Sequence, residues 1–292
     1  MKLTFGLIVF NGGFFLKQVL ETIYPFAHRI CIAEGPVKYW QDKGFVSSTD
    51  NTQEIIRSFP DPQRKIFSHF GQYEEKTNQC QTWFRYVPQD TEYVFCVDAD
   101  EVHRPEDIEK LIFFLEKNRP TSVGFKSDTF FGGFDRIIGG FERNHSFKRV
   151  LKYAPGYYYL THRQPTLAYE GIEIPGRNVT GNELYEWTGI TMPHYSYVSP
   201  KMVHQKLQYY EDQIISKGNC IPNYFTDLWL KWVNNPDQRE DIEKQYKGVQ
   251  EFTPETRGSA YTEPFQGKHP QVIQRDLLIL KQQFDRELDS LR

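Results

Sequence analysis

Short apolar runs alternate with segments of helical periodicity through the first 120 residues of the chain. The apolar runs predict strands at Leu3–Phe10, Arg29–Ala33, Lys65–Ser68 and Tyr93–Val97. The periodic segments that follow them predict helices over 14–23, from the Ser47–Asp50 turn to Phe59, over 74–86 and over 105–117. Strands that alternate with helices form mainly parallel sheets with right-handed crossovers. The pattern therefore predicts an α/β fold whose mainly parallel central sheet is flanked by helices.

The pattern becomes more irregular after Arg119-Pro120. Predicted strands cover 122–126, 146–153 and 157–162, and predicted helices cover 200–216, 224–233 and 272–291. The segment 234–267 is polar, with scattered Pro and Gly, which is typical of a mobile linker or lid. We therefore divide the chain into an α/β part (1–120), an irregular part (121–233), and a mobile segment with a terminal helix (234–292).

Composition narrows the classes of function. The formal net charge is -3 and 25% of the 292 residues are charged, so the chain lacks the basic excess expected of a nucleic-acid-binding protein. No segment approaches the roughly 20 apolar residues that span a bilayer. We expect no nucleic-acid partner and at most peripheral contact with a membrane.

The four cysteines, Cys31, Cys80, Cys96 and Cys220, show no CxxC spacing. Two of them lie in apolar strand-like runs, which favours buried reduced thiols over zinc ligands or a disulfide framework. We therefore expect a reducing, cytoplasmic environment.

Aromatic residues make up 16% of the chain, and many gather between Phe125 and Tyr210. Flat amphipathic rings can line a sugar or nucleoside cleft, and they also fill ordinary cores. The cluster is compatible with both.

The most informative stretch is the predicted strand that ends in Asp98-Ala99-Asp100-Glu101. Ligands bind at the carboxyl ends of strands in open α/β sheets, and hard divalent cations prefer oxygen ligands. Two acids at positions i and i+2 of a strand end can address the same side. The pattern indicates a metal-assisted phosphate-ester site, although acids that precede the helix at Pro105 can also be simple helix caps.

Three motifs occur in the order seen in a known family: Leu7-Ile8-Val9-Phe10-Asn11-Gly12, Ser48-Thr49-Asp50-Asn51-Thr52 and Asp98-Ala99-Asp100-Glu101. Over residues 3–117 the chain resembles the nucleotide-sugar-dependent glycosyltransferases of the GT-A fold, family 2-like. The resemblance implies a GT-A-like fold with a more irregular C-terminal part on the acceptor side. It also implies a Mn²⁺ or Mg²⁺ ion that bridges the donor diphosphate through the DxD acids.

The resemblance assigns roles to individual residues. Asp100 is the expected metal ligand, and Asp98 is expected to contact the sugar nucleotide and to take part in metal binding. His194 is the preferred further metal ligand, with His162 second, because imidazole suits Mn²⁺. The remaining residues expected to bind the sugar nucleotide are Asn11, Glu34, Asp50, Lys76 and Asn78.

The sequence departs from the family pattern between Glu34 and Asp50. The Ser-Thr-Asp turn follows the strand-end acid closely in the family, whereas residues 37–46 intervene here. Glu34 and Asp50 are therefore difficult to place together, and Asp42 is an alternative to Glu34.

An inverting transfer requires a base that deprotonates the acceptor hydroxyl. Four acids lie in the acceptor-side region: Asp128, Asp135, Glu142 and Glu170. Glu170 is the preferred catalytic residue, and Asp128 is the second candidate. Arg143, Lys148 and Arg149 are candidates to hold the diphosphate, and they equally fit a solvated basic face.

The predicted activity is metal-dependent transfer of a sugar from a nucleotide diphosphate sugar, with a UDP-sugar favoured. The predicted acceptor is a glycan or a lipid-linked saccharide, as in polysaccharide biosynthesis. One alternative is a haloacid-dehalogenase-like phosphatase, which also carries DxD after an apolar strand, but near the start of its domain. The other is a non-catalytic sugar-binding protein of the same fold.

Overall fold

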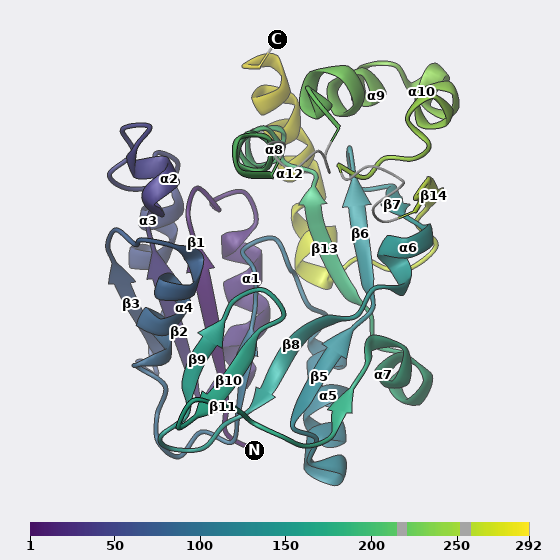
Figure 1. Cartoon of the computed structure of the whole chain (residues 1–292). Helices are drawn as coiled ribbons and strands as arrows, with labels where there is room; N and C mark the ends of the chain where they lie inside the picture. Colours follow the sequence, from purple (N-terminus) through teal and green to yellow (C-terminus); the bar gives the residue numbers. More distant parts are fainter. Residues whose placement is uncertain (215–220, 252–257, 292) are drawn as a thin grey trace. The chain divides into compact units, whose positions relative to one another are not determined.

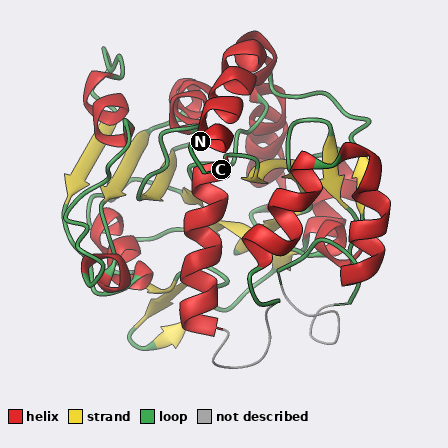
Figure 2. Cartoon of the chain, turned by 90° about the horizontal axis from the view of Figure 1, so that it is seen from above, coloured by secondary structure: helices red, strands yellow, loops and turns green. Residues whose placement is uncertain are grey.

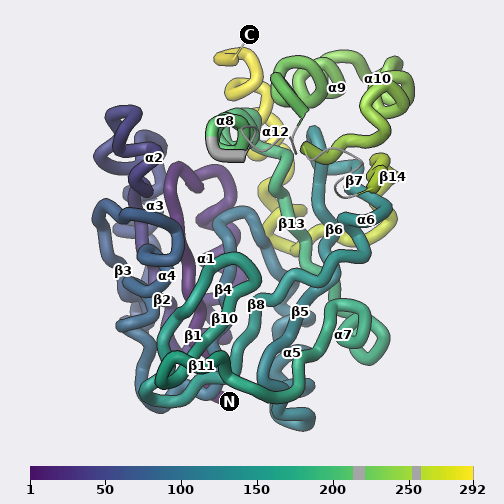
Figure 3. The backbone as a smooth tube through the Cα atoms, viewed as in Figure 1, coloured from purple at the N-terminus to yellow at the C-terminus, as the bar shows by residue number. Residues whose placement is uncertain are grey.

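The computed structural model describes residues 1–214, 221–251 and 258–291, and this part of the chain forms two compact units. The first unit comprises residues 1–126 and 146–191, and the second comprises 127–145 and the residues from 192 onward. The backbone tube in Figure 3 shows how the segment that contains β8 to β11 returns to the strands formed by the first 126 residues. The division at residue 120 thus does not coincide with this grouping, and its functional meaning stays a prediction.

A seven-stranded sheet forms the centre of the first unit (Figures 1 and 2). Its strands follow the order β12-β5-β8-β4-β1-β2-β3. Their bounds are β1 Leu3–Val9, β2 Arg29–Glu34, β3 Ile66–Phe70, β4 Tyr93–Cys96, β5 Ser122–Phe125, β8 Phe147–Lys152 and β12 Asn178–Val179. Only β8 is antiparallel to its neighbours within this sheet. The predicted mainly parallel α/β sheet is confirmed.

Helices connect the strands of the first unit. They are α1 Leu16–Ile23, α2 Lys38–Gln41, α3 Thr52–Ser58, α4 Lys76–Phe84, α5 Pro105–Asn118 and α7 Gly181–Thr188, with a 3₁₀ turn at Tyr24–Phe26. The strand order runs from β1 to β3 in one direction and then returns to β4. Because crossovers are right-handed, this reversal places α4 on the face opposite α1 and α3 (Figure 1).

A small antiparallel sheet lies against α4. Its strands are β9 Tyr158–Thr161, β10 Thr166–Tyr169 and β11 Ile172–Glu173. A two-residue turn, Glu170-Gly171, joins β10 to β11, and both of its residues have positive φ, at 48° and 84°. This is the geometry of the tight turns that suit twisted hairpins.

The core of the first unit is packed around β1 and α4. Trp83 of α4 is 1% exposed, and a Cβ on Gly6 of β1 would lie 2.3 Å from its ring. Glycine at position 6 therefore permits the helix to approach the sheet. Phe5, Phe95 and Phe125 stack across neighbouring parts of the sheet, with centroid distances of 5.3 and 5.5 Å. This packing holds the strand ends at fixed positions.

The second unit is built on a four-stranded sheet of order β13-β6-β7-β14. Its strands are β6 Ser127–Phe131, β7 Arg136–Ile138, β13 Met192–Tyr197 and β14 Thr262–Pro264. Its helices are α6 Gly140–Asn144, α8 Pro200–Ile214, η3 Phe225–Leu230, α9 Lys231–Asn234, η4 Pro236–Gln238, α10 Arg239–Tyr246 and α12 Gln271–Asp289. Trp229 and Trp232 are fully buried in its core, so part of the aromatic excess fills a core.

The segment 234–267, expected to be a linker or lid, contains α10 and β14 within its described residues. Whether it moves stays a prediction. Cys31, Cys80 and Cys96 are buried free thiols, as expected, and Cys220 lies outside the described residues. None of the described helices combines the length and apolar character needed to span a bilayer.

Candidate active site at the strand ends

The candidate site lies where β1, β2 and β4 of the first unit end. β1 pairs in parallel with β2 on one side and with β4 on the other. The carboxyl ends of neighbouring parallel strands meet at one edge of the sheet. The residues that follow them, Asn11, Glu34 and Asp98, therefore gather at this edge.

The loop after β1 is bound to the Ser48–Thr52 turn. The Asn11 amide donates to Ser48 Oγ at 2.8 Å, and the Thr49 amide donates to Asn11 Oδ1 at 2.7 Å. Asn11 has φ of 51°, a left-handed conformation that asparagine tolerates better than most residues. Asn11 thus holds the loop as well as lying at the site.

Asp50 closes the same loop from the other side. Its Oδ2 accepts from the Gly13 amide at 2.9 Å, and its Oδ1 accepts from the Thr52 amide at 3.0 Å, where α3 begins. The Gly12 amide donates to Thr52 Oγ1 at 2.9 Å. A Cβ on Gly13 would lie only 2.0 Å from Asn51 Oδ1. A larger residue at position 13 would therefore have to displace the Asn51 side chain.

Glu34 belongs to the same assembly. Its side chain is fully buried and accepts from the Ser48 amide at 3.3 Å and from Gln53 Nε2 at 2.7 Å. The intervening residues form an excursion that contains α2, so the chain returns to Glu34 despite the long spacing. The structure thus places both Glu34 and Asp50, while Asp42 is exposed and pairs with Lys38 on α2.

The acidic turn after β4 lies against the β1 loop. A Cβ on Gly12 would come within 2.8 Å of the Ala99 Cβ, so only glycine permits this approach. The Glu101 amide donates to the Asp98 carbonyl at 3.1 Å, and the Asp98 amide donates to Glu101 Oε2 at 3.1 Å. Asp98 and Asp100 are both partly exposed, whereas Glu101 is fully buried.

Arg149 of β8 pairs with this acidic turn. Its Nε lies 2.9 and 3.0 Å from the two Glu101 carboxylate oxygens, and its Nη2 lies 2.8 Å from Asp98 Oδ2. Burial lowers the pKa of the guanidinium, but the charges of Glu101 and Asp98 outweigh burial and raise it. Arg149 was expected to hold a diphosphate, and in this structure its partners are carboxylates.

The N-terminal end of α4 carries the basic and amide residues predicted there. Thr77 Oγ1 lies 2.9 Å from His162 Nδ1, which brings the turn after β9 to α4. The pKa of His162 is lowered to about 4, chiefly by burial and then by Lys76 and Arg163, while Asp98 opposes the shift. The structure therefore brings Lys76, His162 and Asp98 into one electrostatic neighbourhood.

Sequence reasoning missed Gln79 on α4 and selected its neighbour Asn78. Asn78 is exposed, whereas Gln79 is 3% exposed. Its Nε2 donates to the Ala33 carbonyl at 2.8 Å and to the Val9 and Gly35 carbonyls at 3.3 Å each. Gln79 thus ties together the ends of β1 and β2. Its position beside the predicted Lys76 was the only signal in the sequence.

The remaining predicted residues lie elsewhere. Asp128 on β6 is 5% exposed and lies 3.8 Å from Arg143, and His194 on β13 is 9% exposed and in register with Thr129 of β6. Both belong to the second unit. Glu170 occupies the β10–β11 turn of the first unit. It follows the last residue of β10, whereas His162 lies near the first. Its conformation is explained by the tight turn, and its predicted role as a base stays untested.

Within the described residues, no three His, Cys, Asp or Glu side chains are grouped to hold a metal ion. The donor chemistry at the end of β4 nevertheless fits a hard cation. Mg²⁺ is commonly bound by one or two carboxylates, with substrate phosphates and water completing the shell. Asp98 and Asp100 match such a substrate-completed site.

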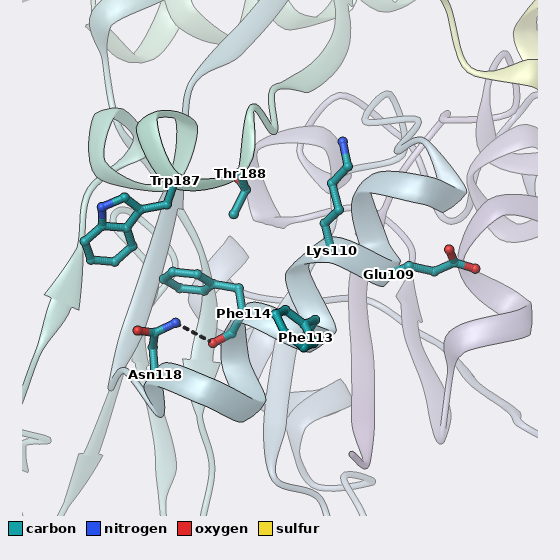
Figure 4. Close-up of a pocket in the computed structure, with 7 residues that line it drawn as sticks. All are labelled: Glu109, Lys110, Phe113, Phe114, Asn118, Trp187 and Thr188. Atoms are coloured by element: carbon teal, nitrogen blue, oxygen red, sulfur yellow. Dashed lines mark hydrogen bonds between the residues drawn. The ribbon is translucent and has the colours of Figure 1, made fainter.

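A pocket of about 690 Å³ lies away from these strand ends, between α5 and α7 of the first unit (Figure 4). Its wall is mainly apolar, with Phe113 and Phe114 on α5 and Trp187 on α7. Asn118 Nδ2 donates to the Phe114 carbonyl at 3.0 Å, as the dashed line in Figure 4 shows. None of the predicted site residues lines this pocket.

One family model matches the part of the chain that contains the acidic turn. Residues 47–168 match the family model described as glycosyl transferase family 2. This range contains the Ser48–Thr52 turn, the DxD acids, Arg149 and His162. No curated protein matches the chain significantly.

Several solved structures resemble the chain at low identity. S. aureus TarS aligns with a TM-score of 0.39 and 11% identity, covering 82% of this chain and 44% of TarS. TarS 1-349 in complex with UDP-GlcNAc aligns with a TM-score of 0.40 and 10% identity, covering 99% and 82% of the two chains. Mycobacterium tuberculosis glucosyl-3-phosphoglycerate synthase, in complex with Mn²⁺, UDP and glucosyl-3-phosphoglycerate, aligns with a TM-score of 0.27 and 14% identity, covering 44% of each chain.

The family match confirms the predicted resemblance and the predicted class of enzyme. The matched range joins the acidic turn after β4 to the turn that holds the β1 loop, so it includes both of these turns, whereas the ends of β1 and β2 lie before it. Residues 47–168 of the chain thus form a region of glycosyl transferase family 2 type.

Proposed function

We propose that the chain transfers a sugar from a nucleotide diphosphate sugar, with a UDP-sugar favoured, to a saccharide or lipid-linked saccharide acceptor. The observation that carries this proposal is the placement of Asp98 and Asp100 at the end of β4, directly against the Gly12 turn after β1. In an open α/β sheet this edge is where a nucleotide diphosphate binds. The family match supplies the class of reaction.

The residues around the acids suit an anionic ligand. Lys76 at the start of α4 and Arg149 beside Asp98 provide positive charge at the edge that carries the acids. Thr77 contacts His162, and the charges of both Lys76 and Asp98 act on the pKa of His162. A neutral imidazole at ordinary pH is the form that can accept a hydrogen bond or bind a metal. We propose that Lys76 pairs with the diphosphate and that Asp98 contacts the sugar nucleotide.

We further propose that Asp100 is the principal protein ligand for Mn²⁺ or Mg²⁺. The bound cation would neutralise the charge that develops on the departing diphosphate. His162 and His194 remain proposed additional ligands, His162 from the first unit and His194 from the second. Each can be assigned by loss of metal-dependent nucleotide binding in the corresponding alanine variant.

Asp128 is our preferred general base, ahead of Glu170. Asp128 is a nearly buried carboxylate whose Oδ1 lies 3.8 Å from Arg143 Nη2. Glu170, by contrast, is exposed in a hairpin turn that explains its presence. Asp128→Asn should abolish transfer while nucleotide binding persists, whereas Glu170→Gln should leave transfer intact. The opposite pattern would reassign the base to Glu170.

The proposed function is tested by thermal-shift measurements with UDP, UDP-sugars and other nucleoside diphosphates, with and without Mn²⁺. A ligand that binds only the folded state at 100 times its Kd stabilises it by about 2.7 kcal/mol. We expect a shift with UDP-sugars that requires Mn²⁺ and is lost in Asp100→Asn. Asp241→Asn, which changes an exposed acid on α10, is the control and should keep the full shift. If no nucleotide stabilises the protein under any condition, the proposal is wrong.

A non-catalytic sugar-binding protein of the same fold is the remaining alternative. It would show the same metal-dependent shift but would release no nucleoside diphosphate when supplied with donor and a panel of saccharide acceptors. The phosphatase alternative is disfavoured by the position of the acids after the fourth strand and by the family match. Release of inorganic phosphate from phosphate esters without transfer would revive it.

A further inference from the structure

The Glu101–Arg149 ion pair adjoins the DxD acids, because Glu101 follows Asp100 in the chain and Arg149 contacts Asp98. The Glu101 side chain is fully buried and the Arg149 side chain is 13% exposed. The guanidinium binds both oxygens of Glu101 through Nε and then reaches the Asp98 carboxylate, whose side chain is 48% exposed. The buried ion pair is therefore connected, through Arg149, to the half-exposed Asp98.

The same carboxylate fixes Asp98 in two ways. Glu101 Oε2 accepts from the Asp98 backbone amide at 3.1 Å, which sets the main chain of the turn. Glu101 also orients Arg149, whose Nη2 holds Asp98 Oδ2 at 2.8 Å. Because the guanidinium is a rigid planar fork, the second contact sets the direction of the Asp98 side chain.

The pair also controls the charge of the site. Asp98, Asp100 and Glu101 place three carboxylates within four residues, and Arg149 supplies one positive charge among them. Arg149 thus offsets part of the negative charge that Asp98 and Glu101 bring to the turn.

We propose that Arg149 and Glu101 are positioning residues that direct Asp98 toward the sugar nucleotide and away from the cation, so that Asp100 serves as the metal ligand. This inference rests on the proposed function. In this proposal the two aspartates have different roles because Asp98 contacts Arg149, a residue outside the DxD motif. The prediction it replaces is the one in which both aspartates bind the metal.

The test measures Mn²⁺ binding without nucleotide, by electron paramagnetic resonance titration of the full chain. The variant is the double substitution Arg149→Met with Glu101→Gln, which removes both charges of the buried pair, keeps similar shapes and leaves the net charge of the site unchanged. Circular dichroism and the urea midpoint establish that it is folded. Mutation of ordinary supporting partners of a metal ligand typically costs 10- to 100-fold in affinity, so a gain in Mn²⁺ affinity would distinguish this pair from them.

We expect the double variant to bind Mn²⁺ more tightly than the wild type, because Asp98 can then turn toward the ion and add a second carboxylate ligand. Adding Asp98→Asn to the double variant should return the affinity to the wild-type value, whereas Asp98→Asn alone should change it little. UDP affinity at saturating Mn²⁺ should fall about tenfold in the double variant. A merely structural pair would weaken both affinities together.

Three results would overturn the inference. These are an unchanged or weaker Mn²⁺ affinity in the double variant, a gain that persists after Asp98→Asn, and a large loss in Asp98→Asn alone. Arg149→Lys keeps the charge without the fork and should fall between the wild type and the double variant. If the Mn²⁺ pattern holds but the wild type binds no nucleotide, the proposed function fails and the assignment of Arg149 and Glu101 to positioning the metal ligands stands.

Discussion

Two regions of the first unit differ in how they are built: the strand-end site and the pocket between α5 and α7. The strand-end site consists of loops that leave β1, β2 and β4 and are joined by hydrogen bonds through Asp50, Glu34 and Gln79. The pocket consists of helix side chains, and its Phe114–Trp187 contact has a centroid distance of 5.4 Å (Figure 4). This pocket is thus separate from the residues that converge at the strand ends.

The difference shows why cavity size alone is a poor guide to function here. The lining of this pocket is mainly apolar, with Glu109 and Lys110 as its charged residues. The strand-end site includes Arg149 and His162, whose pKa values shift in opposite directions for identified reasons. Perturbed groups that converge at a strand edge are the stronger indicator of a reactive site. The following predictions test this contrast.

The largest effect is expected from Arg149→Met alone. It leaves the fully buried Glu101 without its counter-charge, and breaking one side of a buried pair costs about 3–5 kcal/mol. The double variant with Glu101→Gln should recover most of this loss. Urea unfolding of the wild type, the single variant and the double variant measures the loss of stability. Equal stability of the two variants would contradict the account.

Gly12→Ala should destabilise the protein by about 1–3 kcal/mol, because its Cβ would lie 2.8 Å from Ala99 Cβ and 2.9 Å from Val9 Cγ1. It should also weaken nucleotide binding, since the displaced neighbour stands between the two DxD acids. Adding Ala99→Gly removes one of the clashing atoms and should restore part of both properties. Normal stability and binding in Gly12→Ala would show that the β1 loop and the acidic turn are not in close contact.

The pH dependence of stability should carry a signature of His162. Its pKa is about 4 in the folded protein, below its ordinary 6.5, so the unfolded chain binds more protons between these values. Stability contributed by this residue is therefore present above pH 6.5 and is lost as the pH falls toward 4. The side chain is partly exposed, so we expect a difference of about 1 kcal/mol between pH 7.5 and 4.5. His162→Gln should flatten the curve by this amount, and an unchanged curve would contradict the burial of the imidazole.

The smallest effect is expected at the pocket. Trp187 is 51% exposed, so Trp187→Ala should cost only about 0.5–1.5 kcal/mol from the contact with Phe114. Metal-dependent UDP binding should stay unchanged. A loss of UDP binding in Trp187→Ala would contradict the contrast between the two regions and would show that the pocket contributes to nucleotide binding.

The sequence was sufficient for the strand ends because their signals are local. An apolar run that stops at Asp98 and a loop of Asn11 and two glycines are readable without knowledge of tertiary contacts. The partnership of Arg149 with Glu101 was not readable, because it joins residues 48 positions apart and depends on β8 entering the sheet beside β4. The spacing between Glu34 and Asp50 was misleading for a related reason, since the excursion through α2 brings the chain back.

The most direct test of the central account is calorimetric titration of UDP into the wild type and into Asp100→Asn, each with saturating Mn²⁺ and with chelator. The account predicts measurable binding to the wild type only when Mn²⁺ is present, and loss of that metal dependence in the variant. Equal Mn²⁺-dependent affinity in both proteins would contradict the claim that the acids at the end of β4 hold the nucleotide through a cation.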